Sequence, residues 1–199
     1  MVEWLLPKQQ TGVRFSLPAF SNGTSNIKMD THIPDEYLDL VDENDKVVGK
    51  KRRSEVYAEH ISNFRVVNAF VLNSKKEIWI PRRAATKRIF PLCLDMSVGG
   101  HVESGETYED ALRRETQEEI RVNLDKISYR FLGHLTPQKD GVSAYMEVYE
   151  IHLEKVADYN KADFIEHFWL TPAALLQRIK DGDGAKEDLP TLVKLFYQF

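Results

Sequence analysis

The chain has 199 residues, of which 42% are hydrophobic and 29% are charged, so it can bury one core of ordinary globular composition. Its formal net charge of −4 offers no basic field for a nucleic-acid polymer, and no apolar run approaches the roughly 18 residues of a membrane span. The one cysteine, Cys93, excludes an intramolecular disulfide and fits a reducing compartment. We therefore expect a cytoplasmic protein without membrane or nucleic-acid partners.

Residues 1–28 differ from the rest of the chain because they show neither helical nor strand periodicity. They also lack the basic start and apolar region of about 7–15 residues that a secretory signal requires. One interpretation is a disordered extension. Another is that the segment is not native, since Val13-Arg14-Phe15 is encoded by a string (GTT-CGA-TTC) that resembles the T-loop of a transfer RNA gene. Translation would then begin at Met29.

From residue 36 the pattern becomes regular, and strands are predicted where polar and apolar residues alternate or where β-branched and aromatic residues gather. In chain order the expected strands are residues 36–42, 64–73, 77–83, 94–100, 126–135, 142–153 and 164–170. Residues 43–46 predict a turn, the basic run 50–56 predicts a connection, and 73–76 predicts the turn of a hairpin.

Three helices are predicted, at residues 106–120, 171–182 and 187–198. Thr107 and Asp110 have the spacing of a capping box at the start of the first helix. The second helix has Pro172 near its start and Gly182 at its end, as helices commonly do. Strands and helices in this order predict a single α/β domain over residues 36–199, with helices layered on a mixed sheet.

The helix at 106–120 carries three glutamates on one face. Glu115, Glu118 and Glu119 are spaced at i, i+3 and i+4, so they project within an arc of roughly 100°. Like charges at this spacing destabilise a helix by about 0.2–0.5 kcal/mol per pair, and a divalent cation would reverse that effect. Mg²⁺ prefers oxygen ligands and usually takes one or two carboxylates together with substrate phosphate. The alternative is a solvated acidic surface.

Residues 100–122 resemble the signature of the Nudix hydrolases, with six fixed residues at the family's spacing: Gly100, Glu106, Arg114, Glu115, Glu118 and Glu119. The resemblance implies an α/β/α sandwich with a mixed sheet and Mg²⁺- or Mn²⁺-dependent cleavage of a diphosphate linkage in a nucleoside diphosphate derivative or similar small molecule. It also implies that the last three glutamates bind the metal. Glu106 and Arg114 would support the loop–helix geometry, and homodimers are common in the family.

Two positions depart from the family pattern. Thr116 stands where an apolar residue is expected, and Arg121 stands where a glycine normally lets the chain leave the helix in a left-handed conformation. That conformation costs a residue such as arginine roughly 1–2 kcal/mol. Neither change removes a metal ligand, so they affect the geometry after the helix.

Residues 40–56 and 80–106 resemble the Nudix branch that contains type I isopentenyl-diphosphate isomerase and its hydrolase relatives. The catalytic cysteine of the isomerase corresponds to Gly99, which cannot transfer a proton. Of the isomerase's upstream metal histidines, the first matches His60 but the second falls near Val67, and its Glu-x-Glu pair falls within 142–146, where no carboxylate occurs. The sequence therefore favours hydrolysis over isomerisation.

Arg83 and Lys87 match the isomerase positions that grip the diphosphate, and Arg82 and Arg88 flank them. Basic groups of this kind suit a polyphosphate ligand, although an ordinary basic loop would look the same. His101 follows the glycines and is interpreted either as a phosphate contact or as a residue that caps the loop.

The general base stays open among three glutamates. Glu118 is the candidate within the signature, while Glu147 and Glu150 lie on opposite faces of one predicted strand. Aromatic residues could stack a nucleobase, but such residues are more often core: Trp79, Tyr145, Tyr149, Phe168 and Trp169. Some Nudix folds bind nucleotides without cleaving them. Such cases commonly lose signature glutamates, which this chain keeps.

Overall fold

The computed structural model describes residues 35–197, so both interpretations of residues 1–28 concern a segment outside the described residues. The first elements are the strands β1 (Tyr37–Val41) and β2 (Val47–Arg52), which form a two-stranded antiparallel sheet, and the helix α1 (Arg53–Ala58). We refer to these three elements as the N-terminal cap. The prediction that residues 50–56 form a connection is wrong, because they complete β2 and begin α1. None of the β2 side chains is fully buried, so no apolar alternation marked the strand.

The main sheet has the strand order β6-β7-β3-β4-β8, with β5 also paired to β3. Its strands are β3 (Arg65–Leu72), β4 (Ile78–Arg83), β5 (Val98–His101), β6 (Tyr129–Leu135), β7 (Tyr145–His152) and β8 (Phe164–Leu170). The β3–β7 pair is parallel and the other pairs are antiparallel, so the sheet is mixed, as predicted.

Two strands, β4 and β5, pair with different parts of the same edge of β3. β7 pairs with β3 along its whole length, so β4 and β5 must share the opposite edge. β4 pairs with β3 at Leu72 and β5 pairs with it between Val66 and Ala69. The two strands therefore diverge, and the outer edge of β5 has no neighbouring strand in the described part of the chain.

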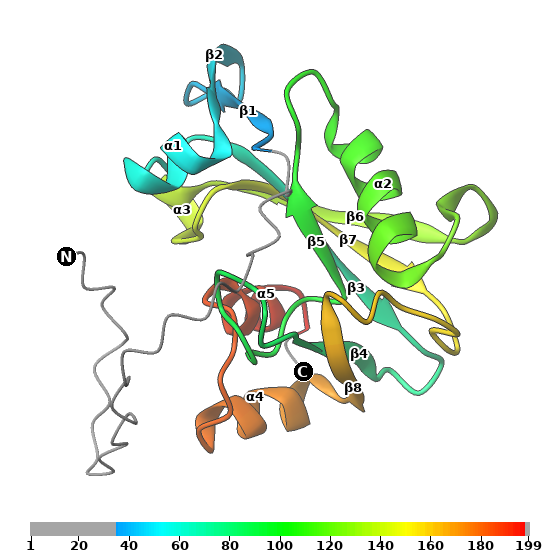
Figure 1. Cartoon of the computed structure of the whole chain (residues 1–199). Coiled ribbons are helices and arrows are strands. Elements are labelled where there is room, and N and C mark those ends of the chain that lie inside the picture. The colour runs from blue at the N-terminus through cyan, green and yellow to red at the C-terminus, as the bar shows by residue number, and fades with distance from the viewer. Residues whose placement is uncertain (1–34, 198–199) are drawn as a thin grey trace, which may run out of the picture. The chain divides into compact units, whose positions relative to one another are not determined.

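Helices cover both faces of this sheet (Figure 1). α2 (Tyr108–Ile120) packs on the face that presents Val67, Ala69 and Val71, whereas α4 (Pro172–Lys180) and α5 (Asp188–Phe196) pack on the face that presents Phe70. The predicted α/β/α sandwich is confirmed. The connections hold two short helices, η1 (Leu124–Lys126) and α3 (Pro137–Asp140). Among residues 35–197 no helix has the length and apolar character needed to cross a membrane.

Both ends of α2 follow from its sequence. At the start, the Thr107 hydroxyl accepts the Asp110 N–H at 3.1 Å and the Asp110 carboxylate accepts the Thr107 N–H at 3.1 Å, which is the predicted capping box. At the end, Arg121 adopts the left-handed conformation with φ 57° and ψ 30°. The chain thus leaves the helix as a glycine would allow, at a cost of roughly 1–2 kcal/mol. Thr116 is fully buried.

Candidate active site

The side chain of Glu119 reaches from α2 to the open edge of β5. Its Oε2 accepts the backbone N–H of Gly99 at 2.9 Å, and the residue is only 9% exposed. Burial raises the pKa of Glu119 well above its usual range, and the nearby carboxylates of Glu115 and Asp95 raise it further. Negative charge is therefore costly at this position unless a cation is close.

Glu115 lies against Gly100, the second glycine of β5. A Cβ atom at Gly100 would come within 1.8 Å of Glu115 Oε1, so only glycine leaves room for this carboxylate. Arg114 Nη1 donates to the same oxygen at 2.6 Å. Burial still raises the pKa of Glu115, although the charge of Arg114 opposes the shift.

Arg114 holds the loop before α2 to the helix. Its Nε and Nη2 donate to the two carboxylate oxygens of Glu106 at 2.8 and 2.9 Å, and Nη2 also donates to the carbonyl of His101 at 2.9 Å. Glu106 in turn accepts the backbone N–H of Glu103 at 2.9 Å, and the hydrogen bond from Arg114 lowers the pKa of Glu106. These contacts tie the loop before α2 to the helix and to the end of β5.

The third glutamate differs from the other two. The Glu118 side chain is 59% exposed, and Arg114 Nη1 lies 3.8 Å from its carboxylate. Within residues 35–197, no three His, Cys, Asp or Glu side chains are gathered in a geometry ready to hold a metal ion. Glu115 and Glu119 nevertheless converge on adjacent glycines, and two carboxylates are enough for Mg²⁺ when phosphate completes its coordination. Two adjacent carboxyls with raised pKa values, one buried and one half-buried, fit a divalent cation in chemistry and charge.

The basic side chains Arg83 and Lys87 face carboxylates. Arg83 Nη1 donates to Asp95 at 2.6 Å, and Lys87 is paired with Asp163. The charges of both aspartates contribute to the raised pKa of Glu119, so this basic loop faces the same region as the glutamates. Asp95 is buried, which would raise its pKa, but the charges of Lys186 and Arg83 hold the pKa below its usual value.

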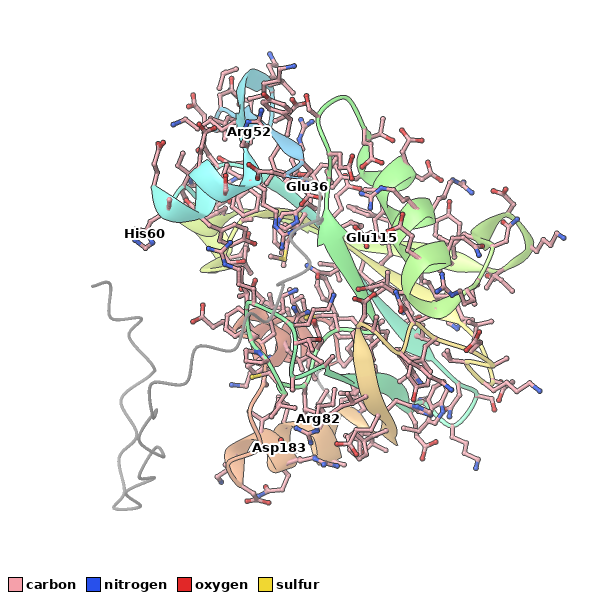
Figure 2. All side chains as sticks on the ribbon, viewed as in Figure 1. Glu36, Arg52, His60, Arg82, Glu115 and Asp183 are labelled. Carbon is pink, nitrogen blue, oxygen red and sulfur yellow. The ribbon has the colours of Figure 1, made fainter. Side chains whose placement is uncertain are left out.

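The residues that flank Arg83 and Lys87 have other partners. Arg82 donates to both carboxylate oxygens of Asp183 at 2.8 Å and to Glu166, so it fastens β4 to β8 and to the segment after α4 (Figure 2). Arg88 is exposed.

Sequence reasoning missed Asp95, Asp163 and Lys186, because only the fold brings these distant positions together.

His101 is engaged at both ring nitrogens. Nε2 lies 2.9 Å from the hydroxyl of Tyr57, and Nδ1 lies 3.1 Å from Glu36 Oε1. Burial lowers the pKa of His101, although the contact with Glu36 opposes that shift. Burial would raise the pKa of Glu36, but the contact with His101 and the charges around it keep the pKa below its usual value. Tyr57 and Glu36 gave no signal in the sequence.

The strand glutamates lie on opposite faces, as predicted. Glu150 is 2% exposed on the α5 side, where it accepts from Arg130 at 2.8 Å and from Tyr197 at 2.9 Å. Glu147 lies on the α2 side and accepts from Tyr149. Glu150 is thus separated from Glu119 by the sheet, which leaves it poorly placed to act as a base there.

The aromatic residues belong mainly to the core. Trp79, Tyr145 and Tyr149 are buried, and the Phe168 ring is covered by the Arg178 guanidinium at 3.8 Å. Trp169 packs against the core cluster under α2. Their packing favours the core interpretation over base stacking.

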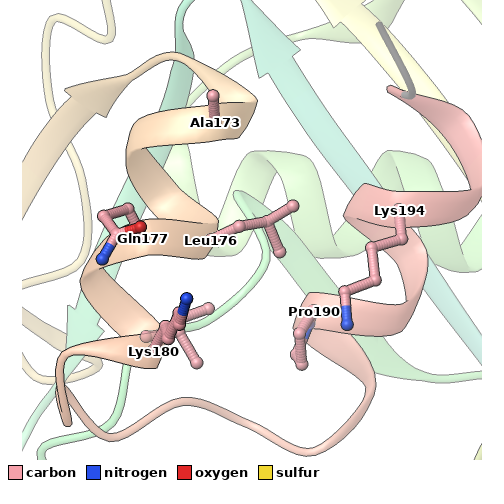
Figure 3. A pocket seen from close by; sticks show the side chains of 7 residues that line it. Ala173, Leu176, Gln177, Lys180, Pro190 and Lys194 are labelled. Carbon is pink, nitrogen blue, oxygen red and sulfur yellow. The ribbon is translucent and has the colours of Figure 1, made fainter.

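Two other places in the fold, the position of His60 and a groove between α4 and α5, differ from the glutamate site. His60, which matches a metal histidine of the isomerase, lies at the outer end of the N-terminal cap, away from Glu115 (Figure 2). A groove of about 480 Å³ runs between α4 and α5. Its lining includes Ala173, Leu176, Gln177, Lys180, Pro190 and Lys194 (Figure 3). No acidic residue lines this groove in the described chain, so it lacks the means to hold a metal.

Comparisons with known proteins bear on the family and the fold of the chain. The family described as NUDIX domain matches residues 62–192. An uncharacterized Nudix hydrolase of Nostoc sp. is 59% identical over 162 residues, covering 81% of this chain and 96% of the relative. The crystal structure of DR0079 from Deinococcus radiodurans superposes with a TM-score of 0.78 at 45% identity, covering 82% of this chain and 100% of that one. An isopentenyl-diphosphate Delta-isomerase of Paenarthrobacter aurescens is more distant, at 25% identity over 155 residues, covering 75% of this chain and 84% of that protein.

Proposed function

The chain belongs to the Nudix hydrolase family, a pyrophosphatase family, and we propose that it cleaves a diphosphate linkage. The proposed substrate is a nucleoside diphosphate derivative or a similar small molecule, and the proposed cofactor is Mg²⁺ or Mn²⁺. One observation carries the proposal. The buried carboxyl of Glu119 and the half-buried carboxyl of Glu115 converge on Gly99 and Gly100.

Glu115, Glu118 and Glu119 are the proposed metal ligands. A divalent cation held there supplies charge for phosphate oxygens and lowers the pKa of a water molecule. The raised pKa values of Glu115 and Glu119 support this assignment, because the positive charges of the protein do not offset the burial of these carboxyls and the repulsion between them. A bound cation would offset both effects. Glu118 lies on the solvent-exposed side of the same helix face, where its carboxylate would be accessible to the metal ion and the substrate.

The remaining roles belong to side chains of the chain itself. Arg114 orients Glu115 through its 2.6 Å contact, and the exposed Glu118 carboxylate is the proposed acceptor of the proton from the attacking water. Arg83 and Lys87 are proposed to bind phosphate oxygens, and His101 to line the same region. For this, Arg83 and Lys87 exchange their contacts with Asp95 and Asp163 for contacts with phosphate. The products are a phosphate monoester and a second phosphate compound.

Two alternatives are separable by simple assays. In an isomerase, a residue other than Gly99 would have to transfer the proton, and deuterium would pass from heavy water into isopentenyl diphosphate. In a binding module without turnover, a nucleotide would bind but no phosphate product would appear. The retained glutamates, and the burial of Glu119 beside Gly99, favour hydrolysis over both.

The deciding experiment measures phosphate products with Mg²⁺ or Mn²⁺ across a panel of nucleoside diphosphate derivatives. Wild type is compared with Glu118→Gln and Glu119→Gln, and with Glu109→Gln, which removes the same charge from an exposed position on the same helix. We expect product from wild type and from Glu109→Gln, and a loss of about 100-fold or more in the other two variants. Equal rates in all four proteins would refute the proposal.

A further inference from the structure

Tyr57 of the N-terminal cap is connected to Glu115 through two intervening residues. The Tyr57 hydroxyl lies 2.9 Å from His101 Nε2. The carbonyl of His101 accepts from Arg114 Nη2 at 2.9 Å, and Arg114 Nη1 donates to Glu115 Oε1 at 2.6 Å. Each contact is within hydrogen-bonding distance, so hydrogen bonds on either side of His101, joined by the covalent frame of that residue, connect the cap to the proposed metal ligand.

Glu36 lies on the other side of the same imidazole. Its Oε1 is 3.1 Å from His101 Nδ1 and 3.4 Å from Arg53 Nη1, but both are charge contacts, because this oxygen has no hydrogen-bond partner among the described residues. The negative charge of the carboxylate favours a ring proton on Nδ1, and with that tautomer Nε2 accepts the proton of the Tyr57 hydroxyl. The ring is also packed edge-on against Tyr57, with centroids 5.8 Å apart. Its orientation is therefore defined from both sides.

His101 is the residue next to Gly100, against which Glu115 packs. A shift of His101 would move its carbonyl relative to Arg114 and would also move the wall of the Glu115 site. In the view of Figure 2, the label of Glu36 is nearer to that of Glu115 than the label of His60 is. The cap and the residue before it thus reach the neighbourhood of the proposed metal site through Tyr57 and Glu36, two residues far from the Nudix signature in sequence.

We infer that Tyr57 and Glu36 are positioning residues, which hold His101 so that Arg114 presents the Glu115 carboxylate to the metal. The inference rests on the proposed function for the role of Glu115. Groups in direct contact with metal ligands typically change metal affinity or activity by about 10–100-fold when they are altered. Tyr57 and Glu36 act through His101 and Arg114, so we expect an effect at the lower end of that range. A purely structural role would instead fasten the cap and change stability alone.

The test uses the full chain with Tyr57→Phe, which removes one hydroxyl and keeps the ring. We expect Mn²⁺ affinity, measured by electron paramagnetic resonance titration, to fall about 10-fold, and kcat at saturating substrate to fall by a similar factor. KM for substrate at saturating Mn²⁺ should stay unchanged. Tyr37→Phe is the matched control, since Tyr37 belongs to the same cap but is 44% exposed, and the Lys50 and Arg52 side chains lie over its ring.

A second variant, Glu36→Gln, keeps an oxygen for His101 Nδ1 but removes the charge, so a partial loss of Mn²⁺ affinity is expected. Thermal unfolding of each variant separates misfolding from mispositioning. Wild-type Mn²⁺ affinity and kcat in both variants, whether or not their melting temperatures fall, would overturn the inference. Failure of the proposed function looks different, because wild type itself would then neither bind Mn²⁺ nor release product.

Discussion

Replacement of Gly100 by alanine tests the geometry of the site most directly. The new Cβ would lie 1.8 Å from Glu115 Oε1 and 2.1 Å from its Cδ, where ordinary contact begins at 3.4 Å. The carboxylate must therefore move by about 1.6 Å (3.4 minus 1.8). Because a misplacement of about 1 Å can cost about 100-fold in rate, we expect kcat/KM to fall by at least about 100-fold.

Stability should change much less than activity. The displaced Glu115 loses its hydrogen bond from Arg114, which is worth about 1 kcal/mol, while alanine is favoured over glycine in a strand by roughly 0.5–1 kcal/mol. The two effects nearly cancel, so the melting temperature measured by circular dichroism should stay close to that of wild type.

Gly49→Ala in β2 is the matched control for this experiment. A Cβ at Gly49 meets nothing within 4 Å among the described residues, so this variant should keep wild-type activity and Mn²⁺ binding. Full activity in Gly100→Ala would show that the Glu115 carboxylate does not need its observed position. The assignment of Glu115 as a metal ligand would then be refuted.

Three further outcomes follow from the surroundings of Glu119, Asp183 and Thr116. Because the folded pKa of Glu119 is raised, the metal-free protein loses stability as pH rises above the unfolded value of about 4.3. Glu119→Gln should therefore melt higher than wild type at neutral pH without metal, match it in acid, and show no increase with Mn²⁺; a lower melting temperature at neutral pH would contradict this. Hydrogen bonds from Arg82 and Arg178 lower the pKa of Asp183 to about 2. Asp183 therefore contributes stability that is fully present above about pH 4 and is lost as the pH falls towards the folded-state pKa of about 2. Urea unfolding should show Asp183→Asn destabilised by about 1–2 kcal/mol at neutral pH, with the difference vanishing in strong acid; a pH-independent difference would count against the ion pairs. The Thr116 hydroxyl is buried without a described partner, so Thr116→Val should raise the free energy of unfolding by about 1 kcal/mol, and a decrease would point to a partner for that hydroxyl.

Local sequence signals predicted the parts of the fold that depend on neighbours along the chain. The capping box of Thr107 and Asp110 located the start of α2, and the spacing of the signature put Glu115 and Glu119 on the face that meets β5. The left-handed conformation expected after the helix is found at Arg121. These features could be predicted because each involves residues a few positions apart.

Features that depend on distant residues gave no such signal. Strand β2 has no buried face, so its pairing with β1 left no periodicity to detect. Asp163 meets Lys87 only because β8 lies beside β4. Tyr57 meets His101 only because α1 folds back beside the end of β5. The unequal burial of Glu118 and Glu119 also required the structure, because helical periodicity alone treats them as neighbours on one face.

The open edge of β5 has a consequence for the behaviour of the protein in solution. An uncovered strand edge invites pairing with strands of other molecules, and here the Glu119 carboxylate accepts the N–H of Gly99 that a foreign strand would otherwise bind. The same acidic group that is proposed to hold the metal thus also blocks intermolecular sheet extension. Variants that remove it should be watched for aggregation as well as for lost catalysis.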